Sequence, residues 1–147
     1  MEKLQAIARL RQSFPDFTAG AWSHEVGASA DPITNSYEFA RFVTALFAQA
    51  DPKQVQRVFD QVEDFLQTGN AEVRDWVCSF LEAVQDIATW KLSGSDVFLR
   101  FLGPETRHAW CALEAIRRDL EDCSALEAEV LMWRIVHHER RTPARAL

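Results

Sequence analysis

The sequence contains few residues that break secondary structure, with five Gly and five Pro among 147 residues. So few breakers argue against a disordered chain and against a β fold with many turns. A hydrophobic share of 48% is large enough for a real core, and the length fits one domain. The composition therefore predicts a single folded domain that spans residues 1–147.

Cysteine and long apolar runs are also scarce. The cysteines Cys78, Cys111 and Cys123 are odd in number and include no closely spaced pair, which predicts free thiols in a reducing compartment. The first residues contain no apolar signal core, and no run approaches the length that spans a membrane. We therefore expect a cytoplasmic protein.

Basic residues are fewer than acidic ones, 16 against 22, which gives a net charge of −6. An acidic surface repels the phosphates of nucleic acids and acidic membranes, so neither is expected as a partner, whereas a basic protein would be attracted. The last residues differ, because 137–147 form a short basic tail with three arginines and one glutamate.

Residues 70–92 show the clearest helical pattern in the chain. Asn70 is a good N-cap, and Glu72 adds a negative charge to the first turn, where the helix dipole favours it. Apolar residues recur at spacings of three and four, which places them on one side of a helix. They are Val73, Trp76, Val77, Phe80, Leu81, Val84, Ile87 and Ala88. The opposite side carries Asp75, Ser79, Glu82 and Asp86, an acidic stripe with no basic residue.

The preceding segment, 52–68, is predicted to be the partner of that helix. Asp51-Pro52 supplies an N-cap followed by proline at the first helical position, and Gly69 is placed to adopt the left-handed C′ conformation. The inward residues are Val55, Val58, Phe59, Val62, Phe65 and Leu66. Since the connection is so short, the helices at about 52–68 and 71–92 are expected to pack as an antiparallel hairpin.

The rest of the chain predicts shorter or less regular elements. Helices are expected at 2–14, at 37–49 with Ser36 as N-cap, at 104–120, and after the capping box Ser124-x-x-Glu127. Residues 96–102 form a short apolar segment of one or two helical turns, and 130–136 are apolar nearly all round. A long irregular loop is expected at about 15–35, with its aromatic residues folded back onto the core. The fold class is therefore all-α, a compact bundle of five or six helices.

No combination of residues predicts catalysis or a cofactor. Glu105 and His108 match one half of a di-iron motif, but that site needs two such pairs and two further glutamates. His108 and Cys111 are two ligands without a second pair, which does not make a zinc site. A cysteine nucleophile would need a neighbouring base that the sequence does not identify. We expect no metal, no cofactor and no enzymatic activity.

The acidic residues of the two central helices are the candidate partner-binding site. They are Asp60, Asp64, Asp75, Glu82 and Asp86, and Trp22 in the long loop is a candidate aromatic anchor. One interpretation is a solvated face of an acidic protein. The other is a docking surface for a basic partner, where such charges speed the encounter.

A resemblance favours the second interpretation. The runs Tyr37-x-Phe39-x-x-Phe42, Gly69-Asn70-x-Glu72-Val73-x-Asp75, Phe80-Leu81-Glu82 and Phe101-Leu102-Gly103-Pro104-Glu105 resemble a family of small all-helical bacterial proteins of unknown function. The family is associated with toxin loci, which implies an immunity protein that binds and neutralises a basic toxin domain. The alternative is a self-associating structural or regulatory module that forms a homodimer through its last helix.

Overall fold

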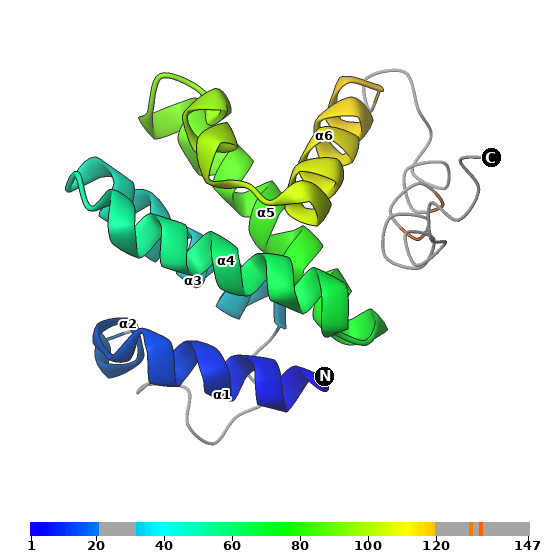
Figure 1. Ribbon diagram of the computed structural model, residues 1–147. Helices are drawn as coiled ribbons and strands as arrows, with labels where there is room; N and C mark the ends of the chain where they lie inside the picture. The colour runs from blue at the N-terminus through cyan, green and yellow to red at the C-terminus, as the bar shows by residue number, and fades with distance from the viewer. Residues whose placement is uncertain (21–31, 120–129, 131–132, 134–147) are drawn as a thin grey trace.

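The computed structural model describes residues 1–20, 32–119, 130 and 133. Within this part of the chain every regular element is a helix (Figure 1). The elements are α1 (Lys3–Ser13), α2 (Pro15–Gly20), α3 (Pro32–Ala48), α4 (Pro52–Thr68), α5 (Ala71–Lys91), the 3₁₀ helix η1 (Ser95–Phe101) and α6 (Pro104–Asp119). The all-α prediction is confirmed.

Helix α5 is the centre of the bundle. Its most extensive contact is with α3, and it also packs against α4, η1 and α6. All eight residues assigned to its apolar side are buried, so the predicted helical phase is correct. The long α5 is surrounded on most sides, because Arg74, Cys78, Ala83 and Gln85 are buried as well.

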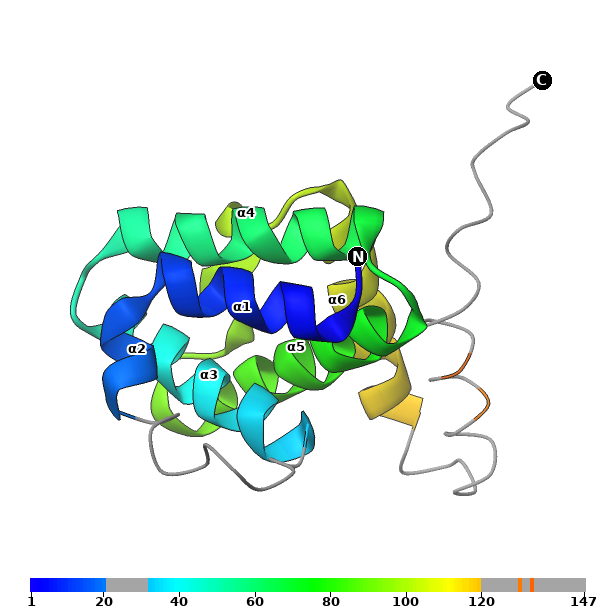
Figure 2. The same cartoon turned by 90° about the horizontal axis from the view of Figure 1, so that it is seen from below.

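Helix α4 has the predicted bounds, and its six inward residues are all buried. Its N-cap is also confirmed, since the Asp51 carboxylate accepts a hydrogen bond from the Gln54 backbone N–H at 3.3 Å. After a two-residue connection the chain turns back, and α5 crosses α4 (Figures 1 and 2). Asn70 caps α5 by accepting from the Val73 N–H at 3.1 Å.

The backbone of Gly69 is extended, with φ −74° and ψ 152°. The predicted left-handed C′ conformation is therefore wrong. The reason for glycine at this position is space. A β-carbon at Gly69 would collide with the carbonyl oxygen of Phe65 and would lie 2.5 Å from Cγ1 of Val73. Glycine therefore allows the close approach of the end of α4 to the first turn of α5.

Aromatic side chains in the core connect α3, α4, α5, η1 and α6. Phe39 of α3 contacts Phe80 of α5 with ring centroids 5.3 Å apart, and Phe59 of α4 contacts Phe98 of η1 at 5.8 Å. Trp110 of α6, which is fully buried, contacts Phe98 at 6.3 Å. Such ring pairs add about 0.5–1.5 kcal/mol each beyond the burial of their surface.

Helix α1 runs antiparallel alongside α4 (Figure 2). Arg9 forms an ion pair with Asp64 at 2.5 Å, and the Gln61 amide donates to the Ser13 hydroxyl. At the start of α1, the amine of Met1 donates to the carbonyl oxygen of Thr68 at 2.7 Å. Side-chain and backbone contacts therefore fasten α1 to the C-terminal half of α4.

The prediction of an irregular segment at 15–35 is wrong at both of its ends. Pro15 ends α1 and then begins α2, because proline lacks an N–H and suits the first position of a helix. Phe17 is buried against Phe39 and Phe42, as expected for a side chain that folds back onto the core. At the other end α3 already begins at Pro32, so Ser36 is a buried helical residue and not the N-cap.

The C-terminal predictions fall mostly outside the described residues. Residues 120–129 and 134–147 include the capping box at Ser124 and Glu127 and the basic tail at 137–147, so these stay predictions. Val130 and Trp133 are described as helical, and both are exposed, 45% and 56%. The single chain therefore does not bury Val130 and Trp133, and a homodimer through this segment stays a prediction.

Candidate functional site

One strip of α5 remains exposed although the rest of the helix is buried. Asp75, Glu82 and Asp86 lie on this strip, and all three are exposed. Their spacings of seven and four residues correspond to about two turns and one turn, so they are aligned along the helix axis. The predicted outward stripe of α5 is therefore present as a continuous acidic strip.

Helix α6 supplies a cation that the pattern of α5 alone does not show. Arg117 forms an ion pair with Asp86, with Nη2 and Oδ1 2.8 Å apart, and its Nη2 also donates to the carbonyl oxygen of Glu82 at 3.2 Å. The charge at this end of the strip is therefore partly compensated. Asp75, near the start of α5, has no ion-pair partner within the described residues.

The pKa of Glu82, in the middle of the strip, is raised above its usual value. Partial desolvation raises the pKa of its carboxyl, and repulsion from Asp86 raises it further, while Arg117 opposes both effects. A raised pKa means that the carboxylate form is destabilised in the folded chain. A cationic side chain placed beside Glu82 by a partner would relieve that destabilisation.

Trp90 is the aromatic residue that sequence reasoning missed. Its side chain is 87% exposed, the highest value among the large apolar residues described. It follows Asp86 by four residues, so the two side chains are on the same side of α5. This spacing was readable from the sequence, because residue 90 has the same helical phase as the outward acids and not that of the core.

Trp22, the aromatic anchor expected from the sequence, lies outside the described residues, so its role stays a prediction. Trp90 is an exposed aromatic residue that adjoins the acidic strip. Large amphipathic rings of this kind are common hot spots in protein interfaces.

Asp60 and Asp64 belong to a different surface of the molecule. Asp64 is held by Arg9 of α1, and Asp60 accepts a hydrogen bond from Gln56 Nε2 at 2.9 Å. Helices α4 and α5 pack through their apolar sides, so their outward sides face in different directions. The five acidic residues predicted as one site therefore divide into two groups, one on α4 and one on α5.

Glu63 on α4 is a further acidic residue that the sequence analysis overlooked. Its carboxylate accepts from the Glu105 N–H at 3.0 Å, the Thr106 N–H at 2.9 Å and the Thr106 hydroxyl at 2.7 Å. Burial raises the pKa of this carboxyl, but the hydrogen bonds from Thr106, Glu105 and Gln67 outweigh burial and lower it overall. Glu63 thus serves as the N-terminal cap of α6 from another helix.

With this geometry established, comparison with known proteins identifies the family. Residues 7–118 match the model of a domain of unknown function, DUF7674. The chain belongs to this family. The comparisons with curated proteins and with solved structures give no significant match.

The DUF7674 match agrees with the coarse form of the resemblance, a family of unknown function that covers most of the chain. The matched range includes the acidic strip, Trp90 and the Glu63 cap. It excludes residues 119–147, which contain the apolar run and the basic tail. The acidic strip, Trp90 and Glu63 therefore lie within the range of the family model, whereas the C-terminal residues lie beyond it.

The residues considered as metal ligands are not gathered in the folded chain. Among the residues that the structure describes, no group of three His, Cys, Asp or Glu side chains could hold a metal ion. His108 and Cys111 lie on α6 and are both exposed, and Cys78 is buried in α5. No helix in the described part of the chain is both long enough and apolar enough to cross a membrane.

Proposed function

We propose that this DUF7674 protein is a non-catalytic binding protein of the cytoplasm whose acidic strip on α5 docks a basic surface of a partner protein. The observation that carries the proposal is the exposure of Asp75, Glu82 and Asp86 along a helix that is otherwise buried. Charges fixed on a rigid central helix keep their positions when the partner arrives, which reduces the ordering cost of association.

The partner is a basic toxin domain of bacterial origin, and the protein acts as its cognate immunity protein. This finer part rests on the resemblance drawn from the sequence motifs and on the charge of the chain. An acidic strip accelerates encounter with a basic surface over about a Debye length, roughly 8 Å at physiological ionic strength. A neutraliser must act faster than its toxin reaches a target, so charge that speeds association suits this role.

The test compares two triple variants with the same change in charge. The strip variant carries Asp75→Asn, Glu82→Gln and Asp86→Asn, and the control carries Asp16→Asn, Asp96→Asn and Asp119→Asn, three exposed residues on other elements. Purified products of the neighbouring genes are screened for binding, and association rates are measured at low and at physiological salt. The same variants are then scored for protection of cells that express the toxin.

We expect the strip variant to associate more slowly at low salt and to protect less well, while the control behaves like the parent protein. Association rates that are equal for the strip variant and the control would contradict the docking role of α5. If the strip variant associates slowly but protects cells as well as the parent protein does, the docking role of α5 is supported and the immunity role is contradicted.

A second candidate function, a self-associating structural or regulatory module, is favoured by the exposure of Val130 and Trp133. Apolar residues exposed together often mark an interface. Sedimentation at several concentrations, with the parent protein and Met132→Glu, distinguishes this candidate, which predicts a dimer that the variant disrupts.

A further inference from the structure

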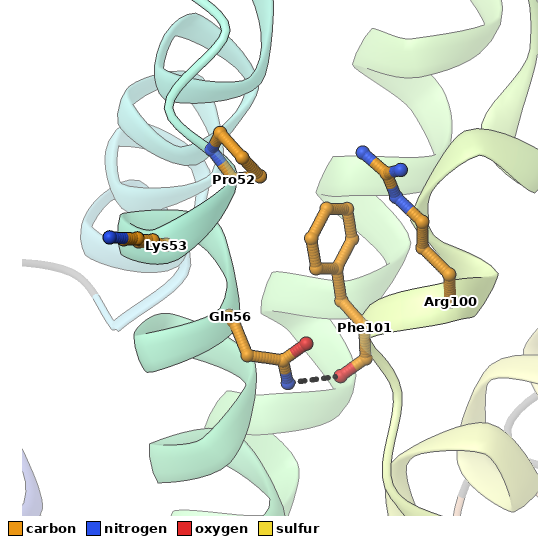
Figure 3. Close-up of a pocket in the computed structure, with 5 residues that line it drawn as sticks. All are labelled: Pro52, Lys53, Gln56, Arg100 and Phe101. Atoms are coloured by element: carbon orange, nitrogen blue, oxygen red, sulfur yellow. Dashed lines mark hydrogen bonds between the residues drawn. The ribbon is translucent and has the colours of Figure 1, made fainter.

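A surface pocket lies between the first turn of α4 and the end of η1. It has a volume of about 300 Å³ and is lined by Pro52, Lys53, Gln56, Arg100 and Phe101 (Figure 3). The pocket is open to solvent on one side, so it suits a small ligand that lies partly exposed. The pocket belongs to elements that the acidic strip of α5 does not use, so it is independent of the proposed docking surface.

The pocket combines the apolar rings of Pro52 and Phe101 with the cationic side chains of Lys53 and Arg100 and the amide of Gln56. The ring of Phe101 lies between Pro52 and Arg100 (Figure 3), and the Arg100 guanidinium lies over this ring at 4.7 Å from its centroid. Contact with the ring limits the freedom of the guanidinium, which leaves its N–H groups oriented for a ligand. Phe101 itself is buried, so this edge of the pocket is a fixed part of the core.

Arg100 has no acidic partner within the described part of the chain, although the protein carries an excess of acidic residues. Arg9, Arg41 and Arg117 each form an ion pair with a carboxylate. An exposed arginine held over a ring and left without a carboxylate is therefore available to bind an external anion.

Gln56 fixes the opposite end of the pocket. Its Nε2 donates to the carbonyl oxygen of Phe101 at 3.0 Å and to Asp60 Oδ1 at 2.9 Å. The Asp60 carboxylate makes this end unfavourable for an anion. A ligand with one charged and one apolar end is therefore oriented with its anionic group toward Arg100.

We propose that this pocket binds a small carboxylic acid with a ring or branched apolar body. The carboxylate pairs with the planar guanidinium of Arg100, whose geometry suits two parallel hydrogen bonds to carboxylate oxygens. The apolar body lies between the rings of Pro52 and Phe101, where part of its apolar surface is removed from water.

The test follows the binding of benzoate to the full chain by titration, with backbone amide shifts of Gln56 and Phe101 as the local readout. Benzamide, which lacks the charge, and acetate, which lacks the apolar body, are the matched probes. We expect benzoate to bind more tightly than both. Benzoate that causes no shift at these residues at about 10 mM, the range of weak small-ligand affinity, would overturn the proposal.

Two variants of Arg100 and one control complete the experiment. Arg100→Gln should weaken benzoate binding about tenfold or more, and Arg100→Lys should recover part of the loss because it keeps the charge without the planar fork. Arg118→Gln, which removes an exposed arginine of α6, should leave binding unchanged. Equal affinity of the parent protein and Arg100→Gln for benzoate would show that the pocket is not the site.

Discussion

Gly103 lies so close to Glu63 that a β-carbon added at residue 103 would be 2.5 Å from Oε2 of the glutamate. The loop before α6 therefore leaves the space in which the carboxylate of α4 reaches the N–H groups of Glu105 and Thr106. Gly103-Pro104 begins α6 without a Ser, Thr, Asp or Asn as N-cap, and Glu63 supplies the missing acceptor.

Gly103→Ala should destabilise the fold by displacing the Glu63 carboxylate from the start of α6. The loss should depend on the glutamate, because in a Glu63→Ala background the added methyl meets no carboxylate. A double-mutant cycle from urea denaturation measures this dependence, and we expect a coupling of about 1 kcal/mol, within the usual range for contacting residues. Additive losses would mean that Gly103 and Glu63 do not interact.

Glu63→Gln should lower the free energy of unfolding at pH 7 by about 1–2 kcal/mol, a moderate value because the carboxylate is only partly buried. The folded-state pKa of Glu63 is lowered from 4.5, so its stabilising effect is present above the unfolded pKa and is lost as the pH falls through the folded value. Denaturation of both proteins from pH 7 to pH 3 should therefore show a difference that shrinks in acid. A constant difference would contradict the capping role.

Leu81→Ala should cost roughly 2–5 kcal/mol, because Leu81 is fully buried at the centre of α5. Asp86→Ala, on the exposed strip of the same helix, should cost less than about 1 kcal/mol, since it removes a solvent-exposed ion pair with Arg117. Chemical denaturation of the two variants compares the inner and outer sides of α5. Similar losses of unfolding free energy in the two variants would contradict the assignment of Leu81 to the buried side of α5 and Asp86 to the exposed side.

The bounds and buried sides of α4 and α5 could be predicted from the sequence, because the apolar spacing and the capping residues indicate the same two helices. Asp51 and Asn70 were identified by residue type alone, since an N-cap needs only a short acceptor beside the first turn. Serine also favours the N-cap position, but Ser36 lies inside α3. A residue type shows which side chain can cap a helix and not where the helix begins. Pro32, which suits a first helical position, was the better signal.

The contacts between helices could not be predicted from the pattern of one helix. Glu63 caps a helix that begins 41 residues later in the chain, and Arg117 reaches Asp86 from a separate helix. Buried polar residues were also missed, because they occur at the margins of the apolar stripe. Gln85 is fully buried and donates to the carbonyl oxygen of Trp110 at 3.1 Å, a contact that exists only after α6 packs on α5.

Trp90 should be the anchor of the proposed docking surface, and its effect should differ from that of the acids. Trp90→Ala removes a side chain that is 87% exposed, so the free energy of unfolding should change by less than about 0.5 kcal/mol. A buried aromatic anchor contributes about 2 kcal/mol or more to binding, which corresponds to a dissociation rate about 30-fold faster.

Because the indole is uncharged, the faster dissociation caused by Trp90→Ala should persist at high salt. The slower association of the strip variant should instead disappear as salt screens the charges. Leu4→Ala is the matched control, since Leu4 is an 81% exposed apolar residue on α1. Dissociation rates of the identified partner are measured for the parent protein and both variants at two salt concentrations. If Trp90→Ala and Leu4→Ala dissociate equally slowly, Trp90 lies outside the interface and the contact rests on the acidic residues alone.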